Sequence, residues 1–154
     1  MRGFRFRLEA ALDLRRTRDA EARRALADAQ GLTKIAAEAV EQAETGLREG
    51  EARAREELAG AHLPGAAVWH RNWMIRLRED VAAARARLRE RQAGERRAAE
   101  RARAARRDLR VLERLRERAW QAYVEEERRA EQRDLDEFAT LRAAAERQSR
   151  KELQ

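Results

Sequence analysis

The stretch Gly60-Ala61-His62-Leu63-Pro64-Gly65 interrupts a sequence of 154 residues that otherwise favours helix. Pro64, the single proline of the chain, cannot donate to a helical hydrogen-bond ladder and disfavours helical backbone at the residue before it. Gly60 suits the left-handed position just past a helix end. The stretch therefore predicts a turn at about residues 60–65, between a helix at about 4–59 and a second helix at about 66–150.

Apolar residues on both sides of this turn recur in alternate steps of four and three, and these positions form a predicted seam on each helix. From Leu8 to Ala54, starting with a step of four, 10 of 14 such positions are apolar. From Met74 to Tyr123, starting with a step of three, 12 of 15 are apolar. This heptad spacing is typical of a left-handed coiled coil, and two helices joined by a short link usually pack antiparallel. The sequence predicts an all-α fold, a long antiparallel two-helix coiled coil (an αα-hairpin), as a single domain over residues 1–154.

The position of the turn also predicts which residues face each other. With the turn centred near residue 64, opposing residues have numbers that total about 128. Phe4 and Phe6 should then lie opposite Trp120 and Tyr123. Beyond Tyr123 the pattern changes phase and an apolar stripe restarts at Leu135, Phe138 and Leu141. The seam can close within one chain or between two, because a hairpin can open and exchange arms.

Composition argues against a compact enzyme fold. The chain has 34 alanines but seven aromatic residues, too little bulk to fill a sizeable core. It has no cysteine, which excludes a disulfide framework and suits a reducing compartment. No run of 18 apolar residues and no apolar signal region is present, so we expect a soluble protein without a targeting segment.

The sequence contains no pattern typical of catalysis or of cofactor binding. The two histidines, His62 and His70, lack metal-ligand spacing, and no glycine-rich loop is present to hold a phosphate. Carboxylates on solvated helices lack the burial that would tune them for acid or base chemistry. We expect no enzyme activity, no catalytic residue, no metal, no cofactor and no small-molecule substrate.

The net charge of +7 is concentrated in one segment. Residues 85–118 contain 14 arginines and six acids, a local charge of +8. A solvated helix face explains this segment most simply. Nucleic-acid binding is the alternative, because such a segment attracts phosphate. The segment has no aromatic residue for base stacking, and its acids recur every few residues, so we do not expect nucleic acid as the partner.

Three stretches carry a resemblance to a known family. The opening FRFRLEAALDLR (residues 4–15), the stretch LERLRER (112–118) and the close EQRDLDEFA (131–139) resemble motifs of the FliJ family, in the same order and over nearly the whole chain. The FliJ proteins are small stalk proteins of the flagellar type III export apparatus. The virulence-type secretion systems have an equivalent stalk, which remains an alternative.

The resemblance implies a function that composition does not. FliJ proteins are antiparallel coiled coils similar to the central stalk of rotary ATPases. They promote assembly of the hexameric export ATPase (FliI), contact the export gate protein (FlhA) and escort export chaperones. By this resemblance the chain would act in the bacterial cytoplasm, at the cytoplasmic face of the inner membrane at the flagellar base, and join the membrane only through the export complex.

The resemblance also implies two contact regions at opposite ends of the hairpin. The region facing the export gate, beside the turn, would comprise Trp69, Trp73, Leu77, Asp80 and Ala84. The region facing the ATPase, at the open end, would comprise Phe4, Leu8, Leu135, Asp136, Glu137 and Phe138.

Overall fold

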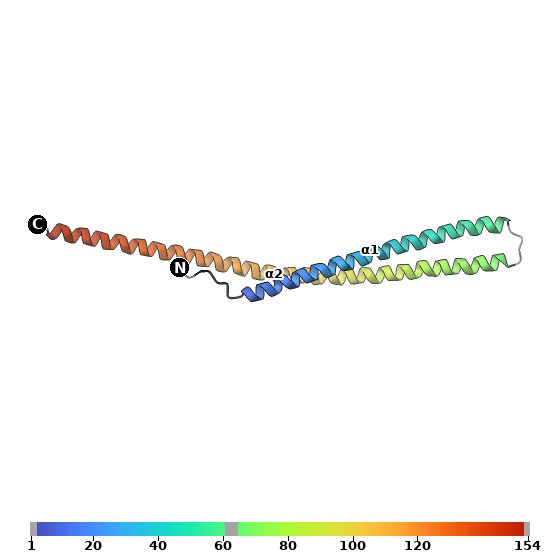
Figure 1. The fold of residues 1–154 in the computed structure, drawn as a ribbon, viewed down its shortest axis with the longest axis horizontal. Coiled ribbons are helices and arrows are strands. Elements are labelled where there is room, and N and C mark those ends of the chain that lie inside the picture. The colour runs from blue at the N-terminus through green and yellow to red at the C-terminus, as the bar shows by residue number, and fades with distance from the viewer. Residues whose placement is uncertain (1–2, 61–64, 153–154) are drawn as a thin grey trace. The chain divides into compact units, whose positions relative to one another are not determined.

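The computed structural model describes residues 3–60 and 65–152, and their side chains apart from Leu58 and residues 149–152. Helix α1 (Glu9–Gly60) has 52 residues and helix α2 (Ala66–Glu152) has 87 (Figure 1). The two helices pack against each other in opposite directions, and the described residues include no strand. The predicted all-α helical hairpin is confirmed.

The chain divides into two compact units. The turn-side unit comprises residues 17–106, and the terminal unit comprises residues 3–16 and 107–152. Both helices contribute to each unit, so each unit has its own interface between α1 and α2.

The buried apolar residues of the turn-side unit lie on the predicted heptad seam. Most are alanines, which bring the helices close together but bury little area. Ion pairs join the helices beside this seam, among them Glu44 to Arg85 at 2.6 Å and Glu51 to Arg78 at 3.8 Å. The residue numbers of these two pairs total 129, close to the predicted 128. The buried apolar residues of this unit are Ala54, Val81, Ala84, Ala98 and Ala102.

Among the described glycines, Gly50 lies closest to side chains of the opposite helix. It is buried, and a Cβ atom added there would lie 2.5 Å from Leu77 Cδ1 and 3.5 Å from Trp73 Cη2. The side chains of Trp73 and Leu77 therefore occupy the space above a residue that has no side chain of its own.

Both ends of the hairpin differ in detail from the sequence-based prediction. Helix α1 begins at Glu9 rather than near residue 4, and residues 3–6 take no helical conformation. In this segment the Phe4 ring packs on Trp120 and Tyr123 of α2. Gly60 is the last residue of α1 rather than the residue past its end. The left-handed glycine is Gly65, with φ of 96°, immediately before α2. The rest of the predicted turn, residues 61–64, lies outside the described residues.

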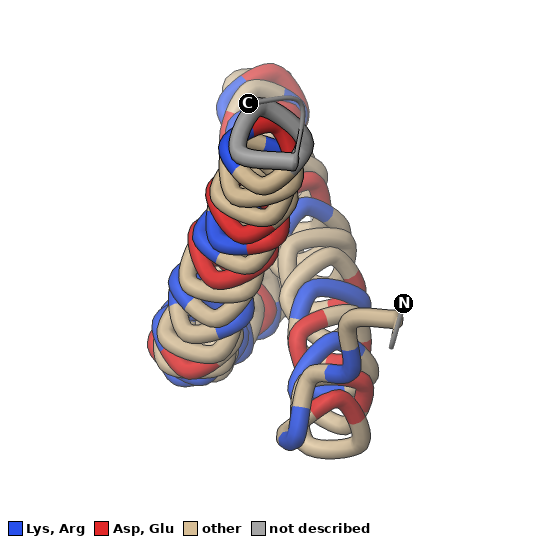
Figure 2. Tube along the Cα trace, turned by 90° about the vertical axis from the view of Figure 1, so that its left-hand side faces the viewer, with Lys and Arg blue, Asp and Glu red and all other residues tan. Residues whose placement is uncertain are grey.

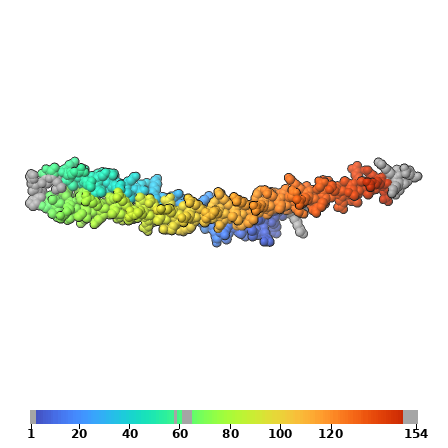
Figure 3. Space-filling view, turned by 180° about the vertical axis from the view of Figure 1, so that it is seen from behind, coloured from blue at the N-terminus to red at the C-terminus, as the bar shows by residue number. Residues whose placement is uncertain are grey.

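The terminal unit has a small core and an uncovered helix end. Leu12 of α1 and Leu109 of α2 are its buried apolar residues among those described, and both lie on the predicted seam. Past residue 130, every described side chain of α2 up to residue 148 is exposed. Figure 3 shows this orange-to-red stretch without another segment over it on the face drawn. No helix in the described ranges is long and apolar enough to cross a bilayer.

Candidate functional site

The residues predicted to face the export gate divide between surface and interface. Trp69 is 60% exposed and Asp80 is also exposed, so both side chains are available to a partner. Trp73 and Leu77 are half-buried against Gly50, and Ala84 is buried in the seam. The predicted stripe therefore offers two accessible side chains, while the other three also hold the hairpin together.

The two tryptophans beside the turn form a stacked pair. Their ring centroids lie 5.5 Å apart with an interplanar angle of 28°. The His70 ring meets Trp69 edge to face at 5.0 Å and lies 6.3 Å from Trp73. His70 is buried, and its Nε2 lies 3.0 Å from Glu57 Oε2 on α1. These contacts fix the orientation of Trp69 and thus present its exposed face in one position.

An aromatic cluster occupies the terminal unit. The Phe4 ring meets Trp120 edge to face at 5.1 Å and Tyr123 at 5.6 Å, while Trp120 and Tyr123 lie 5.8 Å apart. The predicted pairing of Phe4 with these rings is confirmed. The contacts attach the non-helical segment before α1 to the side of α2.

The segment before α1 also forms one wall of an apolar groove. The groove has a volume of about 490 Å³ and is open to solvent. Phe4 and Leu8, both predicted to face the ATPase, line it together with Leu115 and Ala119 of α2. Tyr123 also lines the groove. Partial burial and the carboxylate of Glu127, to which the Tyr123 hydroxyl donates a hydrogen bond, raise the pKa of that phenol above its ordinary value.

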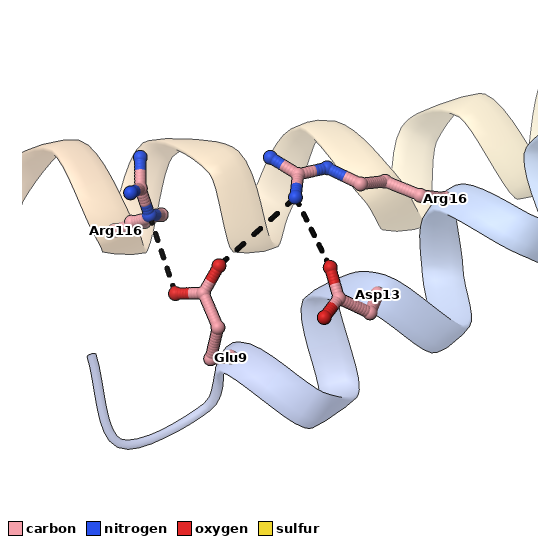
Figure 4. Close-up of polar contacts among 4 residues, drawn as sticks. All are labelled: Glu9, Asp13, Arg16 and Arg116. Carbon is pink, nitrogen blue, oxygen red and sulfur yellow. Dashed lines mark hydrogen bonds and ion pairs between the residues drawn. The ribbon is translucent and has the colours of Figure 1, made fainter. Parts of the chain in front are cut away.

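An ion pair joins α1 to α2 near the start of α1. Glu9 accepts from Arg116 Nε at 3.3 Å and lies 4.0 Å from Arg16, which also pairs with Asp13 at 3.1 Å (Figure 4). All four side chains are substantially exposed, so each pair contributes little to stability. The Glu9–Arg116 pair instead favours one register of α1 against α2, because the two side chains meet only in that register.

The remaining residues predicted to face the ATPase lie farther along α2. Leu135 is 66% exposed and Phe138 is 74% exposed, and Asp136 and Glu137 are exposed beside them. Leu135 lies twelve residues beyond Tyr123, about 18 Å along a helix that rises about 1.5 Å per residue. The predicted ATPase-facing residues thus form two patches, namely the groove (Phe4 and Leu8) and a distal stripe.

A buried carboxylate lies in the seam of the turn-side unit. Asp19 is 1% exposed, and its Oδ2 lies 3.0 Å from Arg23 Nε and 3.6 Å from Arg106 NH1 on α2. Its Oδ1 has no hydrogen-bond partner among the described residues. Heptad spacing placed Asp19 on the seam, but a charged residue type predicts exposure, so the sequence did not reveal its burial.

Charge along the rest of the hairpin is mixed. Lysine and arginine alternate with aspartate and glutamate along both helices (Figure 2). Within residues 85–118, Arg85 and Arg106 pair with acids of α1. The parts of the chain that the structure describes contain no group of three or more metal-ligating side chains. The exposed side chains named above can make apolar and ionic contacts.

Sequence reasoning missed part of the exposed apolar surface. Leu32 and Ile35 on α1 and Val68 on α2 are exposed but were not predicted as contact residues. Leu141, which the sequence places in the same apolar stripe as Leu135 and Phe138 but which was not among the predicted ATPase-facing residues, is 62% exposed and extends the distal stripe beyond Phe138.

Comparison with known proteins gives one match. The family model described as "Flagellar FliJ protein" matches residues 4–148, nearly the whole chain. No curated protein and no solved structure matches this chain. The matched range includes both helices, the aromatic cluster, the groove and the distal stripe.

Proposed function

Since the chain belongs to the FliJ family of flagellar proteins and is thereby a component of the flagellar protein export apparatus, we propose that it acts there as a non-enzymatic stalk. In this role it promotes assembly of the export ATPase ring with one end, contacts the export gate with the other and escorts export chaperones. It works at the cytoplasmic face of the inner membrane. The observation that carries the proposal is the family match over residues 4–148.

The distal stripe is the better candidate for the ATPase contact than the groove. Leu135 and Phe138 expose most of their apolar surface, and Asp136 and Glu137 beside them can pair with basic groups. Phe4, by contrast, already packs on Trp120 and Tyr123. We therefore assign first contact to the stripe and a supporting role to Phe4 and Leu8.

Trp69 is a better candidate for the gate contact than Trp73, Leu77 or Ala84. It is exposed and held in place by Trp73 and His70, so a partner would not need to order it. Asp80 adds a charge. Trp73, Leu77 and Ala84 support this surface from within the interface, and changing them would alter the hairpin as well as the contact.

The ATPase contact is tested by pull-down with the export ATPase, scored by stimulated ATP hydrolysis. The double variant Leu135→Ala plus Phe138→Ala should lose both the pull-down and the stimulation. The matched control is Leu32→Ala plus Ile35→Ala, which removes two exposed apolar side chains at the same i,i+3 spacing from the turn-side unit. Equal activity of the two double variants would contradict the assignment.

The gate contact is tested with the isolated cytoplasmic domain of the gate protein. Trp69→Ala should weaken binding by about fivefold or more, since a tryptophan that a partner covers commonly contributes over about 1 kcal/mol to binding. Ile35→Ala, which also removes an exposed apolar side chain, should bind as the parent protein does. Unchanged affinity of the Trp69 variant would exclude this residue from the contact.

A further inference from the structure

The distal stripe has an internal symmetry in its sequence. It runs Asp134-Leu135-Asp136-Glu137-Phe138-Ala139-Thr140-Leu141-Arg142. Leu135 and Leu141 lie three residues before and after Phe138. Asp134 and Arg142 lie four residues before and after it, with opposite charges. Spacings of three and four residues place all of these on one side of a helix, around Phe138.

This side of the helix is uncovered. Leu135, Phe138 and Leu141 are 66%, 74% and 62% exposed, and all described neighbours from residue 131 to 148 are exposed. Arg142 contacts Glu146 through its Nε at 3.3 Å and is itself 78% exposed. Its other guanidinium nitrogens can therefore reach a second acid.

We propose that a second copy of this chain binds the distal stripe antiparallel, with a two-fold axis through Phe138. The two Phe138 rings then meet at the axis, and Leu135 of each copy meets Leu141 of the other. Asp134 of each copy faces Arg142 of the other. Such a contact is isologous, because each copy contributes the same surface.

Charge selects the antiparallel orientation over the parallel one. Residues 131–137 hold four acids and one arginine, a charge of −3, whereas residues 139–148 hold two arginines and one acid, a charge of +1. The antiparallel arrangement places the acidic half of each copy against the basic half of the other. A parallel arrangement would place Asp134 against Asp134, and Arg142 against Arg142, of the second copy.

The association is weak, because three large apolar side chains per copy fall short of a standard stable interface. It also covers the stripe that the proposed function assigns to the ATPase. Self-association and ATPase binding therefore exclude each other, and free protein at high concentration is a self-covered form.

Cysteine crosslinking tests the geometry, because the chain has no cysteine of its own. In Phe138→Cys the two thiols meet at the axis, so mild oxidation should give a covalent dimer quickly. In Leu135→Cys the thiols of the two copies lie six residues apart along the axis, about 9 Å by helix rise, which is beyond disulfide reach. That variant should crosslink slowly alone and quickly when mixed with Leu141→Cys.

Ile35→Cys provides the rate of random collision, since Ile35 is similarly exposed at 64% in the turn-side unit. A Phe138→Cys rate equal to that of Ile35→Cys would overturn the proposal. Fast crosslinking of Leu135→Cys alone would overturn the antiparallel geometry. The helical circular dichroism signal of each variant verifies that it is folded.

Charge exchange gives an independent readout without cysteine. Sedimentation of the parent protein between about 10 µM and about 1 mM should show a rising mean mass, as expected of a weak complex. Asp134→Arg and Arg142→Asp should each abolish the rise, and the double variant should restore it. A double variant that remains monomeric would count against the pairing. ATPase pull-down at low concentration is a separate measurement, so failure of self-association and failure of the proposed function are distinguishable.

Discussion

Three glycines of α1 provide a quantitative test of how closely the helices approach. A Cβ atom added at Gly31 or Gly46 would meet no atom within 4 Å, whereas one added at Gly50 would lie 2.5 Å from Leu77 Cδ1 and 3.5 Å from Trp73 Cη2. Each glycine in a helix interior costs about 1 kcal/mol relative to alanine. Gly31→Ala and Gly46→Ala should therefore each raise the free energy of unfolding by about 0.5–1 kcal/mol.

Gly50→Ala gains the same helix propensity but loses packing. A contact of 2.5 Å is too short for two carbon atoms, so the end of the half-buried Leu77 side chain must move, at the low end of the cost of overpacking, about 1 kcal/mol. The gain in helix propensity and this cost nearly cancel, so the net change should be about zero or a small loss. Gly50→Ala should thus be at least about 1 kcal/mol less stable than Gly46→Ala, a difference set by the interface alone.

The measurement is urea unfolding followed by circular dichroism at the helical band, with the three variants and the parent protein under one set of conditions. A change of 1 kcal/mol corresponds to about 2–4 °C in Tm for a chain of this size, so thermal unfolding gives a second estimate. If Gly50→Ala is stabilised as much as Gly31→Ala and Gly46→Ala are, the close approach of Leu77 and Trp73 to α1 is wrong.

Three further predictions concern single side chains. Asp19→Leu should raise the free energy of unfolding by about 1 kcal/mol in urea, because it removes a buried carboxylate whose Oδ1 has no partner among the described residues, whereas its ion-pair partners Arg23 and Arg106 are exposed and stay hydrated without it; a loss would contradict this. Phe4→Ala should accelerate amide exchange over residues 9–16 and leave the turn-side unit unchanged, because the ring contacts to Trp120 and Tyr123 attach this end. Tyr123 is the single tyrosine, so absorbance titration should give a pKa above its ordinary 10.0. Because the folded state holds this proton more tightly, stability present below pH 10.0 should be lost as pH rises through the raised pKa, and Tyr123→Phe should remove that loss.

The heptad pattern predicted the interface well. The seven buried apolar residues reported for the described chain, including Leu12, Val81 and Leu109, all lie on the two predicted seams. This succeeded because a long coiled coil repeats one local rule, so each heptad confirms the phase of the next. The opposing pairs followed from the same rule once Pro64 placed the turn.

Features set by contacts between distant residues were less accessible. The start of α1 at Glu9 depends on Phe4 meeting rings of α2, which local helix propensity does not include. The interval of four residues between Trp69 and Trp73 indicates that they share one face of α2, but whether each is exposed depends on the angle of that face to α1. Gly50, which makes room for Trp73, reads in sequence as a weak helix position.

The small core of the terminal unit lowers the free energy needed to unfold the first turns of α1 locally. Among its described residues, Leu12 and Leu109 are the buried apolar pair, and the surrounding ion pairs are exposed and sensitive to salt. This end should fray long before the rest melts, with little energy needed to peel residues 3–16 from α2. A partner that binds between residues 3–16 and α2 would therefore need little free energy to separate them, and added salt would lower that free energy further.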